Sequence, residues 1–152
     1  MRRLLLIVIA LIVLIVPIFV WRSSTPVSPE SSGYRQMPVQ LGGTTLTADV
    51  ADNESQRELG LSGRAGLPEG TGMLFVFQVD GQHAFWMKDM LFSIDMIWLS
   101  PEKKVVYIAA NARPESYPSS YMPESASRYV IEVPAGWAAR HNVAIGSVAQ
   151  FQ

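Results

Sequence analysis

Three charged residues interrupt apolar runs in the second half of this 152-residue chain. Asp95 lies within Ile94–Leu99, Glu132 lies within Tyr129–Val133, and Lys88 follows a Phe-Trp-Met sequence. Because an ionised side chain inside an apolar strand costs several kcal/mol unless it is paired or hydrogen-bonded, each of the three needs a special environment. The pattern predicts that these residues hold either a structural cluster or a binding site.

Two interpretations fit this pattern. In the first, the charges form a buried ion-pair cluster that fixes the register of the strands. In the second, they line a pocket for a polar ligand, and Asp95 and Glu132 could serve as general acid and base, as in glycoside hydrolysis. The spacing of residues along strands does not say whether the two carboxylates face each other. We expect Trp86 to be a core residue, with a stacking surface for a ligand as the alternative.

Composition excludes several other kinds of chemistry. The chain has no cysteine, which excludes disulfides and thiol catalysis. His83 and His141 lack the spacing of metal ligands, so we predict no metal site and no cofactor. From Gln36 onward there are eight Lys or Arg residues against twelve Asp or Glu residues, which argues against a nucleic-acid-binding surface.

Short alternating or apolar runs predict a mainly β (α+β) fold. The segment around Gly42-Gly43 resembles a tight hairpin turn, and Pro134 is expected to start the second of two short helices. Asp52 is expected to cap the first helix, and Gly60 to end it. The predicted strands are 39–41, 44–51, 73–77, 94–99, 105–109, 129–133 and 148–151, with a further strand at the start of the central stretch 85–99 and helices at 53–59 and 135–141. We expect a compact small barrel or sandwich of about seven or eight short strands, with an irregular Pro-rich loop over residues 111–127.

The first 38 residues have a different composition. Leu4–Trp21 is apolar throughout and long enough to span a bilayer, which predicts a transmembrane anchor over residues 1–21 or, alternatively, a cleaved signal segment. Arg2 and Arg3 place the N-terminus in the cytoplasm by the positive-inside rule. Residues 22–38 are rich in Ser and Pro and are predicted to be a linker, which leaves 39–152 as an extracytoplasmic, periplasmic or cell-surface domain.

Several motifs of the chain, taken in order, resemble the domain of unknown function 192 family. These motifs are Asp52…Glu54…Arg57…Gly60-Leu61…Arg64, Gly72-Met73-Leu74-Phe75-Val76-Phe77, Phe85-Trp86-Met87-Lys88, Ile94-Asp95 and Glu132…Pro134-Ala135-Gly136. The resemblance implies a small, mostly β domain that often follows an export segment, and it implies no established activity. It also places Arg57 and Arg64 near the candidate cluster. The chain departs from the family pattern at Ser62, where Met is usual, and at Asp89-Met90, where Asn-Thr is common.

The function that these observations favour is a membrane-tethered extracytoplasmic domain that binds a polar ligand or an envelope partner, in preference to a catalytic function. The candidate residues are Arg57, Arg64, Trp86, Lys88, Asp95 and Glu132. One alternative is an envelope hydrolase, acting on glycans, that uses the two carboxylates. The other is a structural envelope protein in which the ion-pair cluster only holds the fold.

Overall fold

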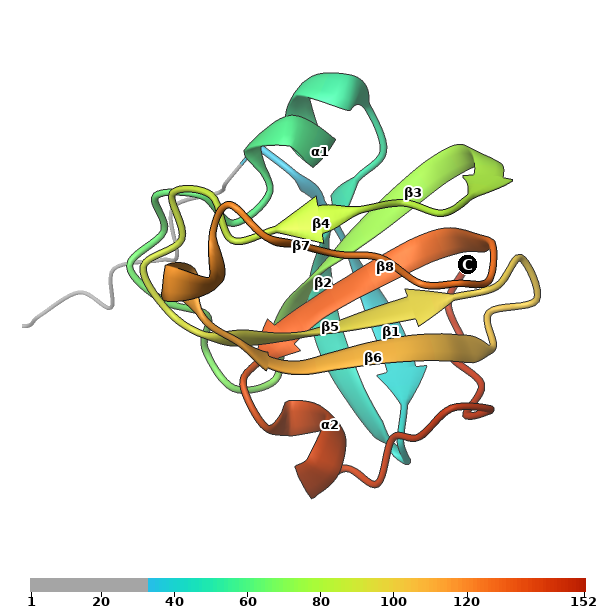
Figure 1. Ribbon diagram of the computed structural model, residues 1–152. Coiled ribbons are helices and arrows are strands. Elements are labelled where there is room, and N and C mark those ends of the chain that lie inside the picture. The colour runs from blue at the N-terminus through green and yellow to red at the C-terminus, as the bar shows by residue number, and fades with distance from the viewer. Residues whose placement is uncertain (1–32) are drawn as a thin grey trace, which may run out of the picture. The chain divides into compact units, whose positions relative to one another are not determined.

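Eight strands and two short α-helices make up residues 33–152, the part of the chain that the computed structural model describes (Figure 1). The strands are β1 (Arg35–Leu41), β2 (Thr44–Ala51), β3 (Thr71–Gly81), β4 (Phe85–Trp86), β5 (Ile94–Leu99), β6 (Val105–Ala112), β7 (Ser120–Tyr121) and β8 (Ser127–Pro134). The helices are α1 (Glu54–Leu59) and α2 (Trp137–Arg140), and a 3₁₀ turn, η1, spans Pro114–Ser116. The predicted mainly β fold of about seven or eight short strands with two short helices is confirmed.

The predicted transmembrane segment, residues 4–21, and most of the predicted linker lie outside the described residues. Within residues 33–152, no helix has both the length and the apolar character that a membrane span needs. The first strand begins at Arg35, four residues before the predicted start of the domain. Residues 35–38, which are mostly exposed, are part of a strand because β1 is an edge strand, where exposed side chains and a proline are tolerated.

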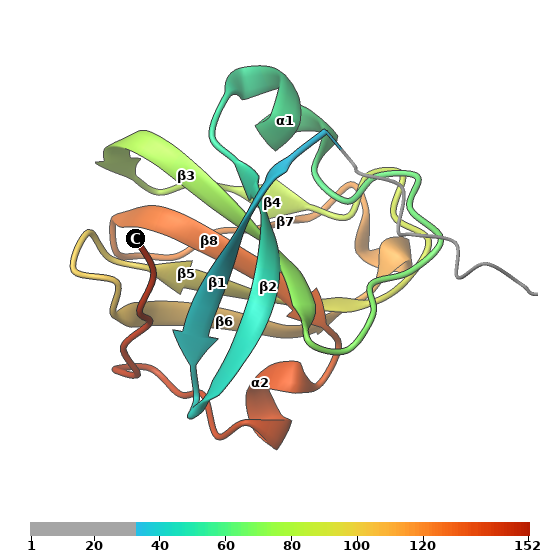
Figure 2. The ribbon, with the colours of Figure 1, turned by 180° about the vertical axis from the view of Figure 1, so that it is seen from behind.

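Six strands form one mixed sheet in the order β1-β2-β3-β8-β5-β6. Only β2 and β3 run parallel within it, and α1 lies in the connection between them. The sheet curls, and the C-terminal segment bridges its two edges through Gln150 to Gln40 and through Val148 to Lys104 (Figures 1 and 2). The strand predicted at 148–151 is therefore present as two isolated bridges that join β1 to the start of β6.

Apolar side chains cover both faces of this sheet. One face carries the α2-side core, built mainly from Leu41, Leu46, Leu74, Ile97, Leu99, Ile131, Val133 and Trp137. The other face carries the ribbon-side core, which includes Leu61, Met73, Phe75, Met87, Ile94, Met96, Trp98 and Val130. Successive side chains of a strand point to opposite faces, so β5, which is buried at all six positions, contributes to both cores. The predicted strand 94–99 is confirmed, and it is covered on both sides.

The caps of α1 differ in part from the prediction. Asn53, not Asp52, caps the helix, since its side chain accepts a hydrogen bond of 3.0 Å from the backbone N–H of Gln56. Asp52 instead makes an exposed ion pair with Arg35. Gly60 ends the helix as predicted, with a φ of 51° that a residue with a side chain rarely adopts.

The segment 111–127 is more regular than expected. Its first two residues extend β6, and Ser120–Tyr121 forms β7, which pairs with β4 in a two-stranded ribbon. In this ribbon Phe85 lies opposite Tyr121, and Trp86 lies opposite Ser120. Pairing satisfies backbone groups that would otherwise lie unpaired over the apolar ribbon-side core, which is why this Pro-rich stretch is not a free loop.

Candidate functional site

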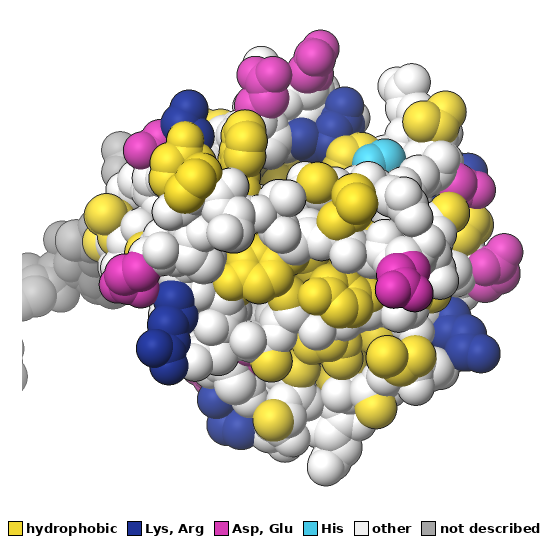
Figure 3. Space-filling model, in the orientation of Figure 1, with side chains coloured by type: hydrophobic (Ala, Val, Ile, Leu, Met, Phe, Trp, Pro, Cys, Tyr) yellow, Lys and Arg dark blue, Asp and Glu magenta, His cyan; other side chains and the backbone are white. Residues whose placement is uncertain are grey.

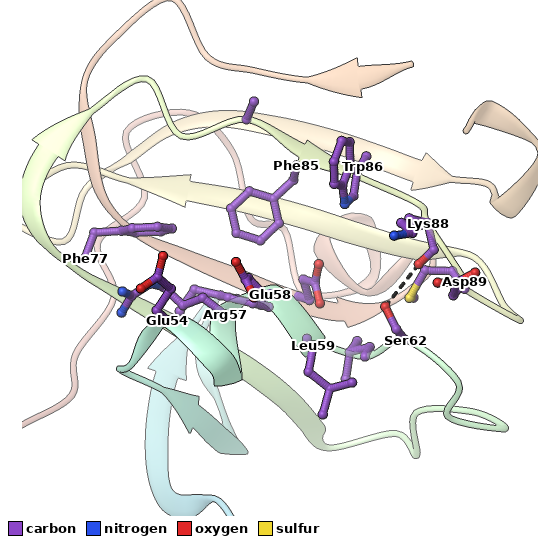
Figure 4. A pocket seen from close by; sticks show the side chains of 16 residues that line it. Glu54, Arg57, Glu58, Leu59, Ser62, Phe77, Phe85, Trp86, Lys88 and Asp89 are labelled. Carbon is purple, nitrogen blue, oxygen red and sulfur yellow. Dashed lines mark hydrogen bonds between the residues drawn. The ribbon is translucent and has the colours of Figure 1, made fainter. Parts of the chain in front are cut away.

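An open pocket of about 930 Å³ lies between α1 and the segment that begins with β4 (Figure 4). Helix α1 supplies charged side chains to one wall, including those of Arg57 and Glu58. Phe85, Trp86 and Lys88 come from the opposite wall. The pocket thus lies over the ribbon-side core, beside the two-stranded ribbon.

Two hydrogen bonds hold the walls together at one end of the pocket. The Ser62 hydroxyl donates to the carbonyl of Lys88 at 3.0 Å (Figure 4). The N–H of Gly63 donates to the carbonyl of Asp89 at 2.9 Å. Asp89 has a φ of 56°, in the left-handed region that Asp tolerates better than most residues. Ser62 and Asp89, two of the three positions at which the chain departs from the family pattern, are therefore neighbours in space.

Strand alternation decides which residues of the Phe-Trp-Met-Lys element face the solvent. Met87 is 1% exposed in the ribbon-side core, whereas Trp86 is 56% exposed and Lys88 is exposed. The expectation that Trp86 belongs to the core is wrong, because its neighbour Met87 takes the inward position. Lys88 forms no ion pair with any residue of the described range 33–152, so it is not the buried partner of a carboxylate there.

Glu132 is the buried acid of the pocket. It lies in the central strand β8, where Met73 of β3 and Met96 of β5 are its cross-strand neighbours. The residue is 4% exposed, and neither oxygen accepts a hydrogen bond from the described part of the chain. Burial against this apolar surface raises the pKa of Glu132 to about 8, although the charge of Arg64 lowers it in part. The carboxyl group therefore keeps its proton at neutral pH.

Arg64 lies near the pocket but is not among the residues that line it. Its guanidinium donates to the carboxylate of Asp49 at 2.8 Å and lies 5.5 Å from the ring centre of Tyr34. Asp49 is only 7% exposed and lies opposite Met73 in the register of β2 and β3. Arg64 therefore neutralises a buried acid two strands from Glu132, and its electrostatic effect extends to Glu132.

Arg57 is held in the wall by its neighbours. One guanidinium nitrogen donates to the carbonyl of Val76 at 3.0 Å, and the guanidinium lies 5.3 Å from the ring centre of Phe77. His83 stacks on the same phenylalanine at 3.5 Å between ring centres. Burial lowers the pKa of His83, so the imidazole is neutral at pH 7. Arg57 is therefore a wall residue, and part of its guanidinium is already engaged by Val76 and Phe77.

Asp95 lies outside the pocket. It is fully buried, and its oxygens accept hydrogen bonds from the backbone N–H groups of Asn111 (2.8 Å), Gly136 (3.0 Å) and Ala138 (3.0 Å). These contacts join the end of β6 to the start of α2. The side chain thus serves the fold, and the structure does not bring it together with Glu132 or Lys88.

Sequence reasoning missed the acidic side of the pocket. Glu54, Glu58 and Asp89 all line it and are exposed. The signal that could have found the first two is their i, i+4 spacing, which places both on one face of a helix that also carries Arg57. Among the described residues, no three His, Asp or Glu side chains lie together in a way that could hold a metal ion.

The face of the molecule that carries the ribbon is partly apolar. Figure 3 shows hydrophobic side chains gathered across it, with charged side chains mostly around the margin. In the ribbon and the residues on either side of β7, Trp86, Tyr117 and Met122 are all exposed. Tyr117 contacts Trp86 edge-on, at 6.2 Å between ring centres.

Comparisons with known proteins give a family and a fold. A family model, DUF192, described as "Uncharacterized ACR, COG1430", matches residues 37–151. A crystal structure of "a putative transcription regulator" from Sinorhizobium meliloti 1021 is similar at 31% identity and a TM-score of 0.73, over 78% of this chain and 95% of that one. A protein of unknown function from Novosphingobium aromaticivorans DSM 12444 is similar at 26% identity and a TM-score of 0.74, over 84% of this chain and 94% of that one. No curated protein matches the chain.

Proposed function

Since the chain belongs to the uncharacterised domain of unknown function 192 family, we propose a function from its pocket: the domain binds a polar ligand between α1 and β4. The observation that carries this proposal is Glu132, a carboxyl group that is 4% exposed, lines a pocket of about 930 Å³ and has no hydrogen-bond partner within residues 33–152. A buried polar group without a partner destabilises the fold, and such groups occur where function requires them. A ligand that bonds to Glu132 would supply the partner.

The proposed setting is the outer side of a membrane. The apolar run Leu4–Trp21, with Arg2 and Arg3 before it, is the support for a single-pass anchor with a cytoplasmic N-terminus. The domain would then meet ligands or envelope proteins outside the cytoplasm. A reporter fused after Gln152 tests this: alkaline phosphatase should be active there and a cytoplasmic reporter inactive, and the reverse pattern would contradict the proposed topology.

The two alternatives, a hydrolase and a purely structural protein, each need an arrangement that Asp95, Glu132 and Lys88 do not have. A hydrolase that uses Asp95 with Glu132 needs both carboxylates in one site, but Asp95 does not line the pocket and is occupied by three N–H groups. A purely structural cluster needs satisfied charges, but Glu132 has no partner in the described residues and Lys88 has no ion pair there. We therefore favour binding.

The description of the Sinorhizobium protein as a regulator is not carried over to this chain. Residues 33–152 contain nine Lys or Arg residues and twelve Asp or Glu residues, which gives a formal charge of −3. Proteins that bind DNA need clustered positive charge along one face. The charge balance supports a ligand other than nucleic acid.

The proposal is tested on the fragment 33–152. This fragment contains both cores and every strand of the described residues. Its compactness by itself, and the similarity to the Sinorhizobium chain over 95% of that chain, support its use as a folding unit. A library of small polar compounds is screened by ¹H–¹⁵N NMR, and shifts are expected around Glu132 and Trp86. Ala84→Trp should abolish them because Ala84 is exposed and lines the pocket, so that an indole there fills it.

The matched control is Ala65→Trp, an exposed alanine outside the pocket lining, which should bind as the wild type does. Compounds that bind equally well to the Ala84→Trp variant bind elsewhere and do not count. If the library yields no compound whose shifts are lost in Ala84→Trp and kept in Ala65→Trp, the pocket is not a ligand site and the proposal fails.

A further inference from the structure

The free polar groups of the pocket are of mixed charge. Lys88 is exposed and has no ion pair with the described residues, while Glu54 and Glu58 are exposed on the opposite wall and Asp89 lies beside the lysine. Glu132 is uncharged at neutral pH. An anion such as phosphate would meet three carboxylates and two cations, the unengaged ammonium group of Lys88 and the guanidinium of Arg57, which already bonds to Val76 and lies over Phe77. The pocket therefore lacks the excess of free cations by which proteins recognise anions.

The aromatic side chains of the pocket do not form a cage for a cation. Phe77 is already contacted by Arg57 and stacked by His83. Phe85 makes edge contacts with Phe75 at 4.8 Å, with Phe77 and with Trp98, and is part of the packing. An ammonium cage needs several free ring faces around one point. Among the aromatic residues that line the pocket, Trp86 alone is largely exposed.

The pocket thus combines one exposed indole with hydrogen-bond donors and acceptors. This combination suits a neutral ring that carries hydroxyl groups. A sugar ring presents C–H groups on its faces, which pack on an aromatic ring, and hydroxyl groups around its rim, which donate and accept hydrogen bonds. A protonated carboxyl group can donate to one hydroxyl oxygen and accept from another O–H group. Charged side chains such as Lys88 and Glu58 bond to hydroxyl groups without a net charge on the ligand.

From this combination we infer that the pocket takes a neutral saccharide, either a free oligosaccharide or a unit of a glycan, whose ring packs on Trp86 while a hydroxyl group bonds to Glu132. This inference rests on the function proposed above and names its ligand class. The pocket volume of about 930 Å³ lies near the upper end of the range for small-molecule sites, which leaves room for more than one sugar ring.

The test uses the fragment 33–152 with chitotriose and cellotriose as probes. Trp86, Trp98 and Trp137 are the three tryptophans of this fragment, and the latter two are fully buried, so an indole N–H signal that moves can be assigned with the Trp86→Phe variant. At least one trisaccharide is expected to shift the Trp86 signal when it is added at up to roughly 10 mM, a concentration that detects dissociation constants in the millimolar range. Trp86→Ala should weaken this binding by about tenfold or more, the loss expected for one good stacking contact.

Two further variants separate a ligand contact from an effect on the fold. Ile145→Ala, which shortens an exposed apolar side chain outside the pocket lining, should bind as the wild type does. Glu132→Gln keeps one donor and one acceptor and should bind within a few-fold of the wild type, whereas Glu132→Leu should lose about tenfold or more. Backbone signals of the α2-side core report whether each variant keeps the native fold.

The inference is overturned if neither trisaccharide shifts the Trp86 signal at roughly 10 mM. It is also overturned if tetramethylammonium or inorganic phosphate binds at this site in place of the saccharides. In both cases, polar compounds whose binding is lost in Ala84→Trp would leave the proposed ligand-binding function standing. Failure of the ligand class is thus distinguishable from failure of the function.

Discussion

Asp95 and Glu132 lie on opposite faces of the six-stranded sheet, although they are one step apart in its register. Met96 of β5 pairs with Glu132 of β8, and Asp95 pairs with Val133. Because successive side chains alternate, Asp95 points to the face of the α2-side core and Glu132 to that of the ribbon-side core. One carboxylate therefore holds the fold while the other reaches a pocket, and the two should respond differently to mutation.

Asp95→Ala should strongly destabilise the domain. It removes the acceptor of three backbone N–H groups in a site that is fully buried, and each buried N–H left without a partner costs about 1–3 kcal/mol. We expect the melting temperature of the fragment 33–152 to fall by roughly 10 °C or more, measured by circular dichroism. Asp95→Asn keeps one acceptor oxygen and should cost less.

The control for this change is Asp52→Asn, which alters an acid whose ion pair with Arg35 is about half exposed on both sides. Exposed pairs contribute about 0–1 kcal/mol, so the melting temperature should move by only a few degrees. A small effect for Asp95→Ala, similar to that of the control, would mean that water replaces the lost acceptor and that Asp95 is not a structural residue.

The sequence shows that both carboxylates are anomalous but not that they are separate. Alternation along one strand places Trp86 and Lys88 on the side opposite Met87, but it does not say which side is the core, and the expectation of a core Trp86 took the wrong side. The relation between two strands depends on their register, and no residue pattern within β5 or β8 states that Met96, not Asp95, lies opposite Glu132. For this reason the sequence could predict strands, helices and unusual residues, whereas the membership of the pocket depended on pairings between distant strands.

Long-range pairing also explains two other differences between the predicted and the observed structure. The polar, Pro-rich segment 111–127 has little strand character of its own, yet two of its residues pair with β4 because that strand has no other partner. The i, i+4 spacing of Glu54 and Glu58 indicates one face of a helix, but it does not say what that face lies against. The position of Glu58 in the pocket follows from where α1 lies between β2 and β3.

Glu132 should contribute a fall in the stability of the domain as the pH rises from about 4.5 to about 8. Below pH 4.5 this residue is protonated in both the folded and the unfolded chain and adds no pH dependence. Between its unfolded pKa of 4.5 and its folded pKa of about 8, only the unfolded chain releases the proton, so unfolding becomes more favourable. The difference amounts to roughly 4–5 kcal/mol across this range, and it stays constant above it.

Glu132→Gln isolates this contribution, since glutamine does not titrate. Urea unfolding at several pH values should show the variant gaining stability relative to the wild type from pH 4.5 upward, with the gain levelling off near the folded pKa of about 8. Glu58→Gln is the control, because Glu58 is exposed in the same pocket. If wild type and Glu132→Gln show parallel pH profiles, the carboxyl group of Glu132 is solvated and its pKa is not raised.

Lys88→Met should leave the stability of the domain nearly unchanged. Lys88 is exposed and has no ion pair with the described residues, so removing its charge should alter the free energy of unfolding by less than about 0.5 kcal/mol. The matched change is Lys103→Met, because Lys103 donates to the carbonyl of Phe151 and lies 4.4 Å from its ring centre. That variant should lose about 1 kcal/mol. A drop of roughly 10 °C in the melting temperature of Lys88→Met would show that the lysine has a buried partner and would remove it from the pocket.

Arg64→Met should change both the stability of the domain and the titration of Glu132. Asp49, only 7% exposed, would lose its guanidinium partner and keep the amide of Gln36, at a cost of about 1–3 kcal/mol given the partial exposure of Arg64. Because the charge of Arg64 lowers the pKa of Glu132, its loss should raise that pKa further.

The fall in stability with pH should then extend to higher pH in Arg64→Met than in the wild type, which urea unfolding between pH 6 and about 10 would measure. Arg35→Met, which breaks the exposed pair with Asp52, should not change the pH at which the fall in stability ends. If Arg64→Met is destabilised but its pH profile keeps the wild-type end point, the guanidinium serves Asp49 alone and does not act on the pocket. If the pH at which the fall ends is higher in Arg64→Met, the charge of Arg64 helps to set the pKa of Glu132 although Arg64 does not line the pocket. Glu132 would then take up or release its proton according to the charges two strands away.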